Sequence, residues 1–219
     1  MKKIKLLFVA LFLLMATIAN AQFANSSALS GSAVGSSDIE GGWSGITASY
    51  NSNTWDAEDA DFDNIHGLEL GYLYGMRLSA NLPLYLESGL LANYAFGELY
   101  NEDEVTLSAS MFSLKVPVTL GYKVDVADQF SILPYAGLYL KGNLAGTLTY
   151  EDDYYDEEKD SDLFDEDEGD GNRFQFGMHV GVRCLVNNFN FGIGYGFDFN
   201  ELAEDVKTSS LNFTIGYNF

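Results

Sequence analysis

Residues 189–197, FNFGIGYGF, alternate strictly between large apolar side chains and glycine or asparagine. An alternation of period two over this length predicts a β-strand with two unlike faces, one aromatic and one polar or empty. Seven other segments alternate in a similar way, and we find no segment with a sustained period of 3.6 residues. The predicted strands cover residues 43–51, 65–78, 84–97, 107–123, 130–146, 173–186, 189–197 and 208–219. The sequence therefore predicts an all-β fold of eight strands.

The first 21 residues are expected to be removed before the protein folds. A basic start, MKKIK, precedes 14 mostly apolar residues and a small-residue motif, ANA. This run is shorter than the ~20 apolar residues that a membrane-spanning helix needs. We therefore predict a signal peptide, residues 1–21, cleaved after Ala21. Residues 22–42, rich in Ser, Gly and Ala, are predicted to be flexible, and residues 43–219 to form the folded domain.

Two kinds of barrel fit the alternating pattern. In a soluble, ligand-carrying barrel the aromatic face would line the interior, whereas in a membrane barrel it would face lipid. A glycine-rich outer surface would be poorly hydrated, but glycine suits the crowded interior of an eight-stranded barrel. The connections between strands are alternately short and mostly longer, which is the pattern of outer-membrane barrels. Both features favour the membrane barrel.

The acidic residues gather on the side of the longer connections. The chain has 32 Asp and Glu against 11 Lys and Arg, and a net charge of −21. Of the acidic residues, 25 lie within residues 51–64, 98–105, 149–172 and 200–207. A soluble barrel offers no reason for such sorting. A charge of this size repels nucleic acid, so we expect no nucleic-acid partner.

The C-terminus carries a more specific feature, since the chain ends in Phe219 at the last step of an alternating strand, LNFTIGYNF. This ending resembles the strand by which the outer-membrane assembly machinery recognises its clients, with Phe219 as the assembly signal. Together with the signal peptide, FSLKVPVTLGYK and LPYAGLYL, it makes residues 43–219 resemble the small outer-membrane β-barrel family (PorT-like, or OmpX and OmpA membrane-domain, type). The resemblance implies an eight-stranded antiparallel transmembrane β-barrel in a bacterial outer membrane, with little indication of activity.

In such a barrel the aromatic face meets lipid and the opposite face lines the lumen. The predicted lipid-facing residues of the last two strands are Phe189, Phe191, Ile193, Tyr195, Phe197, Phe213, Ile215 and Tyr217. Charges inside a narrow barrel must be paired or hydrated, which predicts a luminal ion-pair network. Its predicted members are Glu69, Arg77, Glu87, Lys115, Lys123, His179, Arg183 and Asp198. A narrow or gated pore through this network is the alternative.

Strand 130–146 is ambiguous in its facing. We assign Leu138 and Leu140 to the apolar face, because the other choice would place Lys141 and Asn143 there. Pro117 and Pro134 fall inside predicted strands. Proline removes a ladder donor, and a closed barrel has no edge strand to accommodate it, so we expect β-bulges at both prolines. Cys184 is the single cysteine, so the fold has no internal disulfide.

The two histidines are candidates for catalysis. Outer-membrane lipid A hydrolases of this size use a Ser and a His close together, but neither His66 nor His179 has a serine nearby in the sequence. The two histidines are also expected at different depths, which argues against a zinc site. We therefore expect no catalytic residue, no metal site and no cofactor.

The segment 150–172, YEDDYYDEEKDSDLFDEDEGDGN, is a candidate site for divalent cations or an extracellular partner. The EF-hand pattern fails in it at Gly169 and Asp170, and a solvated acidic loop is the plainer expectation. The leading hypothesis is a non-enzymatic outer-membrane barrel with a plugged polar lumen and acidic extracellular loops. A small pore and a lipid A-modifying enzyme are the alternatives.

Overall fold

The computed structural model describes residues 42–57, 60–79, 81–102, 105–152, 154–155, 157–165 and 171–219. The predicted signal peptide and all but the last residue of the predicted flexible segment lie outside these residues. The chain divides into the units Met1–Ser36 and Ser37–Phe219, and every described residue belongs to the second.

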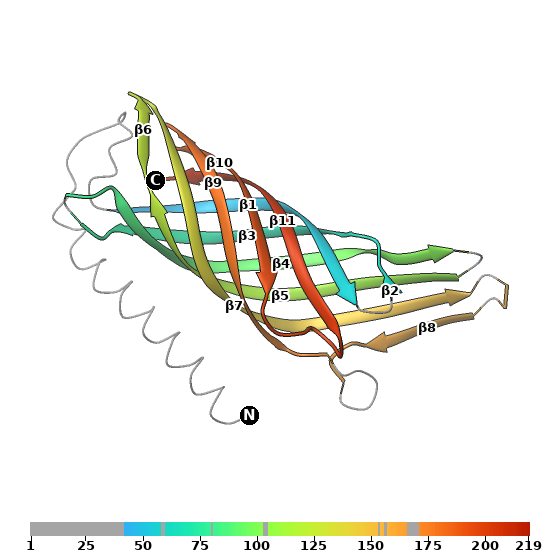
Figure 1. The fold of residues 1–219 in the computed structure, drawn as a ribbon. Helices are drawn as coiled ribbons and strands as arrows, with labels where there is room; N and C mark the ends of the chain where they lie inside the picture. Colours follow the sequence, from blue (N-terminus) through green and yellow to red (C-terminus); the bar gives the residue numbers. More distant parts are fainter. Residues whose placement is uncertain are drawn as a thin grey trace, which may run out of the picture. The chain divides into compact units, whose positions relative to one another are not determined.

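The regular elements of the described residues are all β-strands, and eight of them form a closed antiparallel ring (Figure 1). In order around the ring they are β1 (Gly42–Ala57), β3 (Ile65–Arg77), β4 (Leu84–Glu102), β5 (Val105–Tyr122), β7 (Phe130–Asp152), β9 (Phe174–Val186), β10 (Phe189–Asp198) and β11 (Val206–Asn218). Three short strands, β2 (Ala60–Asp61), β6 (Val124–Ala127) and β8 (Glu157–Asp162), pair with ring strands without entering the ring. The predicted all-β, eight-stranded antiparallel barrel is confirmed.

The ring closes between its first and last strands. β1 and β11 pair continuously, from Gly45 opposite Asn218 to Ala57 opposite Val206. Beyond this ladder, the backbone N–H of Phe219 donates to the carbonyl oxygen of Ser44 at 2.8 Å. Closure gives the backbone groups of both strands their hydrogen-bond partners, which a sheet in lipid requires. In the described part of the chain, no helix is long and apolar enough to cross a membrane.

The strands begin and end near the predicted residues at the short-turn end and run longer than predicted at the other. β1 continues to Ala57, β4 to Glu102 and β7 to Asp152, past the predicted limits of 51, 97 and 146. Most side chains of these extensions are polar and not buried. Without one buried face and one outer face, the sequence has no alternation from which a strand can be predicted. Parts of the predicted long loops are therefore β-hairpins.

The prediction of β-bulges at the two prolines is wrong. Pro117 lies opposite Tyr139, and Pro134 opposite Val182, in unbroken register. The hydroxyl of Ser88 on β4 donates to the Pro117 carbonyl oxygen at 2.7 Å, which satisfies one acceptor beside the proline. A proline removes one donor without lengthening its strand, so the ladder can pass it without a shift. The register shifts occur elsewhere, at Glu98/Tyr100, Phe112/Ser113 and Asp125/Ala127.

The two faces of the ring differ as the alternation predicts. Large apolar side chains point outward, and strand β7 follows the assignment made from the sequence, because Leu138 is 58% exposed while Tyr139 is buried. At the register shift opposite Phe112, two consecutive residues of β7, Leu144 and Ala145, are exposed. The residues on either side of them, Asn143 and Gly146, are buried. An extra residue of this kind changes which face the rest of the strand presents.

The interior is layered. Near the short turns lies an apolar cluster of Trp43, Leu73, Tyr85, Leu91, Leu133 and Leu185. At the opposite end, below the long hairpins, lies a second apolar cluster, formed by Trp55, Ile65, Ala95, Leu99, Ala109, Met111, Leu163, Phe164 and Leu202. Most of the buried polar and charged residues of the ring lie between the two clusters, and they form the candidate site.

Candidate functional site: the polar interior of the barrel

A doubly hydrogen-bonded ion pair spans the interior between β4 and β9. Arg183 Nη1 donates to Glu87 Oε2 at 2.5 Å, and Nη2 donates to Oε1. Both side chains are buried, and the guanidinium lies over the ring of Tyr135, 4.7 Å from its centre. The planar guanidinium matches a carboxylate in this geometry, so the pair joins two non-adjacent strands.

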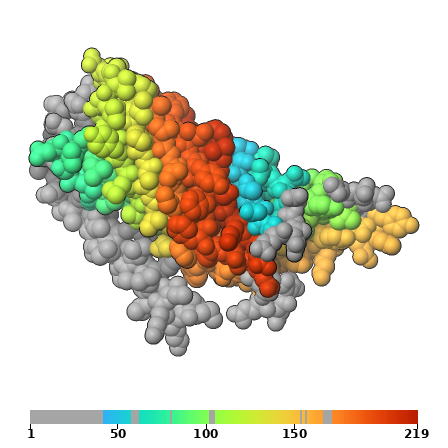
Figure 2. Space-filling model, viewed as in Figure 1, coloured from blue at the N-terminus to red at the C-terminus, as the bar shows by residue number. Residues whose placement is uncertain are grey.

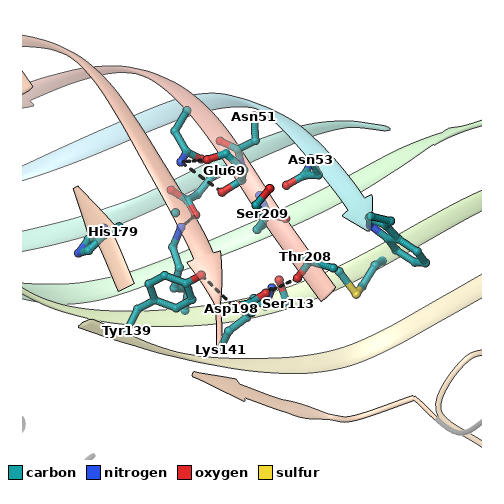
Figure 3. A pocket seen from close by; sticks show the side chains of 17 residues that line it. Asn51, Asn53, Glu69, Ser113, Tyr139, Lys141, His179, Asp198, Thr208 and Ser209 are labelled. Carbon is teal, nitrogen blue, oxygen red and sulfur yellow. Dashed lines mark hydrogen bonds and ion pairs between the residues drawn. The ribbon is translucent and has the colours of Figure 1, made fainter. Parts of the chain in front are cut away.

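A second set of charges lies deeper toward the loop end (Figure 3). Lys115 Nζ lies 2.5 Å from Glu69 Oε2, and Lys141 Nζ donates to Asp198 Oδ2 at 2.7 Å. Asp198 also accepts hydrogen bonds from the Tyr139 hydroxyl at 2.8 Å, from Gln175 Nε2 at 3.0 Å and from the Thr208 hydroxyl. Four side chains thus donate hydrogen bonds to the buried Asp198 carboxylate, and these hydrogen bonds replace those that water would supply.

The two histidines do not share a site. His179 lies in the interior, where its Nε2 and the Thr119 hydroxyl are 2.8 Å apart, and its ring makes T-shaped contacts with the rings of Tyr135 and Tyr139. His66 lies on the outer surface, where its Nδ1 hydrogen-bonds with the Tyr50 hydroxyl at 2.5 Å. No three His, Cys, Asp or Glu side chains among the described residues are close enough to hold a metal ion.

Two of the predicted network members lie at the short-turn end instead. Lys123 Nζ is 3.0 Å from Asp125 Oδ1, and Arg77 Nε donates to the Leu82 carbonyl oxygen at 3.4 Å in the turn between β3 and β4. A hydrogen bond from the Ser131 hydroxyl, and another from Lys123, lower the pKa of Asp125. Of the predicted residues, Glu69 and Lys115, and Glu87 and Arg183, thus form ion pairs inside the barrel, whereas Arg77 and Lys123 lie at its short-turn end.

The glycines of the inner face make room for two tyrosines of β7. A Cβ atom at Gly181 would lie 2.5 Å from the Tyr135 hydroxyl, and one at Gly177 would lie 2.5 Å from that of Tyr139. A Cβ at Gly194 would also collide with the Tyr135 hydroxyl. At Gly177, Gly181 and Gly194 the glycine face is therefore covered by tyrosine rings, whereas Gly196 lines the polar cavity described next.

A small cavity of about 50 Å³ remains in the polar layer, room for a few water molecules (Figure 3). Asn51 and Asn212, which face each other across the β1–β11 ladder, line it, and their side-chain oxygens are buried without a hydrogen-bond partner from the protein. The two apolar clusters lie toward the short turns and toward the long hairpins from this layer.

The acidic segment 150–172 is not one solvated loop, which corrects the plainer expectation for it. It forms the end of β7, all of β8 and then a return into the barrel, where Leu163 and Phe164 are buried in the loop-end cluster. Arg173 fixes this return, because its Nη2 donates to the Phe164 carbonyl oxygen at 3.2 Å and its guanidinium lies 5.2 Å from the Phe164 ring centre. The structure does not describe residues 166–170.

Several interior residues were not among the predicted members of the luminal network. They are Tyr135, Tyr139, Lys141, Asn143, Gln175 and Thr208. Lys141 and Tyr139 could have been included, because both occupy the face opposite Leu138 and Leu140. The apolar clusters were harder to predict from the sequence. In the short-turn cluster, for example, Leu73, Leu133 and Leu185 are isolated apolar residues on otherwise polar faces.

A closed antiparallel ring of eight strands with an apolar outer surface and buried ion pairs defines a membrane-embedded β-barrel. This chain belongs to the outer membrane protein beta-barrel domain family, whose sequence profile matches residues 8–219. It is therefore a protein of the bacterial outer membrane, embedded in a lipid bilayer, and the resemblance found in the sequence is confirmed.

Several solved structures are similar to this chain. Ail, the attachment invasion locus protein of Yersinia pestis, is 16% identical over 83% of this chain and 100% of its own, with a TM-score of 0.46. Neisserial surface protein A is 14% identical over 80% of this chain and 97% of its own, with a TM-score of 0.45. The outer membrane enzyme PagL is 15% identical over 78% of this chain and 98% of its own, with a TM-score of 0.47. The sequence matches no curated protein.

Proposed function

We propose that this outer-membrane barrel is a non-enzymatic protein with a plugged lumen, whose acidic hairpins and loops contact cations or partner proteins outside the cell. The observation that carries the proposal is the layered interior. The Lys115–Glu69 and Lys141–Asp198 pairs lie between the two apolar clusters, and the Glu87–Arg183 pair lies among residues of the short-turn cluster. These pairs would stiffen the barrel and leave no continuous aqueous path.

The packing of the interior supports a plug better than a pore. A conducting lumen of this width would need its charged side chains to line water, but Glu87 and Arg183 are buried against each other. At the loop end, Leu163 and Phe164 return from the acidic segment and fill the mouth of the barrel. Opening a passage would require removing these side chains from an apolar cluster, which is unfavourable in water.

The outer surface and the ends of the chain fit this proposal. Exposed apolar side chains of the last two strands, including Phe191, Ile193, Phe213 and Ile215, would face lipid. The termini would lie in the periplasm, after cleavage of the signal peptide behind Ala21, and the acidic hairpins outside. Phe219, whose side chain is 66% exposed, would serve the assembly machinery as a recognition signal before the ring closes.

The arrangement of the histidines favours a non-enzymatic protein over a lipid A-modifying enzyme. A hydrolase of that kind needs a nucleophile activated by an adjacent base. His179 contacts the hydroxyl of Thr119 and is enclosed by two tyrosines inside the barrel, away from the outer surface where a lipid would bind. His66, on that surface, pairs with a tyrosine.

The proposal is tested by two assays on the refolded full-length mature protein. Vesicles that contain it should not swell in small sugars, and mass spectrometry of lipid A incubated with it should find no modified species. Refolding is checked first by the different migration of unboiled and boiled samples on a gel. Swelling above that of empty vesicles would establish a pore, and a modified lipid A would establish an enzyme.

A further inference from the structure

The cavity in the polar layer is lined by buried oxygen atoms that no protein donor reaches. Asn51 on β1 lies directly opposite Asn212 on β11, and both residues line the cavity. Asn51 is only 2% exposed, and the side-chain oxygens of both residues are buried without a hydrogen-bond partner. Burying an acceptor without a partner is unfavourable, so the two oxygens indicate a bound species that satisfies both.

The orientation of the Asn212 amide follows from the contacts of its nitrogen. Nδ2 donates to the carbonyl oxygen of Ser210 at 3.3 Å and to that of Gly194 at 3.5 Å, so the unpartnered atom of this amide is the oxygen. Side chains directly opposite each other in an antiparallel pair have Cβ atoms about 5 Å apart. The oxygens of Asn51 and Asn212 are therefore close enough to contact the same small ion.

A carboxylate lies beside the two amides. Glu69 on β3 lines the same cavity and is paired opposite Ser49, two residues before Asn51 on β1. Figure 3 shows the side chains of Glu69 and Asn51 next to each other, and Glu69 Oε2 lies 2.5 Å from Lys115 Nζ. Carboxylate and amide oxygens are hard ligands, which bind hard cations in preference to soft ones.

The charges around the cavity decide which hard cation fits. Both carboxylates that line it are already paired, Glu69 with Lys115 and Asp198 with Lys141. A calcium ion takes six to eight oxygen ligands, with carboxylates prominent among them, and no unpaired carboxylate lines this cavity. A monovalent cation is bound by uncharged oxygens alone, as in potassium-selective filters. Water fits less well, because it needs donors for its own oxygen, whereas the two unpartnered atoms that a cation would bind are both acceptors.

We propose that this cavity binds one alkali-metal cation, sodium or potassium, through the side-chain oxygens of Asn51 and Asn212, with the Glu69 carboxylate beside them. The ion would connect β1 to β11, where the ring closes, and would therefore stabilise the closed barrel. This site is separate from the acidic hairpins of the proposed function, and neither depends on the other.

The surroundings of the site predict an enclosed ion of modest affinity. Leu211 and Phe213, the neighbours of Asn212 on β11, are exposed on the outer surface, and Figure 2 shows no opening over β10 and β11 in that view. The charges of Lys115 and Lys141 repel a cation even though each is paired, so we expect a dissociation constant in the millimolar range.

Urea unfolding of the refolded full-length mature protein, in vesicles of phosphatidylcholine, tests the proposal. Choline chloride is replaced stepwise by sodium or potassium chloride at a constant total of about 0.15 M, so that screening does not change. For a dissociation constant of about 15 mM, the equilibrium constant of unfolding should fall about tenfold along a saturable curve. The ion that acts at the lower concentration is the preferred occupant. An unfolding constant that depends on neither ion would overturn the proposal.

Matched variants locate the effect. Asn51→Leu and Asn212→Leu remove one oxygen each with little change in volume, and both should lose the dependence on the ion. Asn143→Leu is the control, because Asn143 also has a buried, unpartnered side-chain oxygen but does not line the cavity. It should keep the dependence, whatever its own stability. Loss of the dependence in the control, or its survival in both cavity variants, would contradict the site.

A second measurement needs no variant. Crystals of the parent protein are soaked in rubidium chloride, and the anomalous scattering of rubidium is mapped. We expect a peak in contact with the side-chain oxygens of both Asn51 and Asn212. Ordered water between these oxygens, with no anomalous peak, would overturn the proposal.

Discussion

The contact between the glycine face and Tyr135 makes a sharp prediction for Gly194→Ala. The added methyl group would fall on the Tyr135 hydroxyl, closer than the 3.0 Å below which real Cβ contacts essentially do not occur. The ring cannot easily retreat, because it packs beside Gly181 and under the guanidinium of Arg183. Overpacking of this kind typically costs about 1–3 kcal/mol, and we expect Gly194→Ala to lower the free energy of unfolding by about that amount.

Tyr135→Phe supplies the test of the mechanism, because it removes the hydroxyl and keeps the ring. The next nearest atoms to the new methyl group are then the Val180 carbonyl oxygen at 3.4 Å and Cζ of the ring at 3.5 Å, which are near ordinary contact distances. In the Tyr135→Phe background, Gly194→Ala should therefore lower the free energy of unfolding by less than about 0.5 kcal/mol. The difference between the costs in the two backgrounds is the coupling energy, and it lies well within the range that double-mutant cycles resolve.

The assay is urea unfolding of the four proteins in lipid vesicles, followed by tryptophan fluorescence. Gly142→Ala is the matched control, since a methyl group there meets only the Leu114 carbonyl oxygen, at 4.0 Å. It should leave the free energy of unfolding within about 1 kcal/mol of the parent value. If Gly194→Ala costs nothing, or costs the same with and without the Tyr135 hydroxyl, the account of the glycine face is wrong.

Three further predictions concern the ion pair, the outer surface and the loop-end cluster. Glu87→Ala should lower the unfolding free energy by about 3–5 kcal/mol, and adding Arg183→Met should restore part of the loss, because the single variant leaves a buried unpaired charge; a single variant as stable as the parent would contradict this. Ile193→Lys should cost about 2–4 kcal/mol and reduce insertion into vesicles, whereas Glu201→Lys should insert normally. Phe164→Ala should speed hydrogen exchange in residues 157–165, measured by mass spectrometry, and unchanged exchange would show that Phe164 does not anchor the hairpin.

The fold was predictable because the membrane imposes a simple pattern on a β-barrel. Each strand has one face in lipid, so apolar residues such as Phe191 and Ile193 recur at every second position. The parts of the strands outside the lipid are not under this constraint, so their sequences need not alternate between apolar and polar residues. The strand extension from Glu98 to Glu102 and strand β8 therefore carried no alternation that the sequence analysis could use.

The interior was predictable in its facing but not in its partners. The alternation places Glu69, Glu87 and Asp198 on the face opposite the large apolar residues, and all three are buried. Which cation meets which carboxylate depends on the stagger between non-adjacent strands, and no local pattern encodes that stagger. In the structure Lys115 pairs with Glu69, and Glu87 pairs with Arg183, 96 residues away in the chain.

A loop also contributes side chains to the interior, and the acidic composition of that loop gives no indication of it. Leu163 and Phe164 are two apolar residues in an acidic segment, and nothing in their neighbourhood marks them as buried. Their burial depends on a loop that returns into the barrel mouth, where Arg173 binds the Phe164 carbonyl oxygen. Contacts of this kind arise from tertiary structure and have no periodic signature.

Single-channel recording of the refolded protein in a planar bilayer distinguishes a plugged interior from a pore. We expect no steady conductance steps from samples whose folding is verified by heat-dependent gel migration, since apolar clusters lie at both ends of the polar layer. Reproducible steps, with an ion selectivity altered by Lys115→Ala or Glu69→Ala, would contradict it and make the buried charges the lining of a pore.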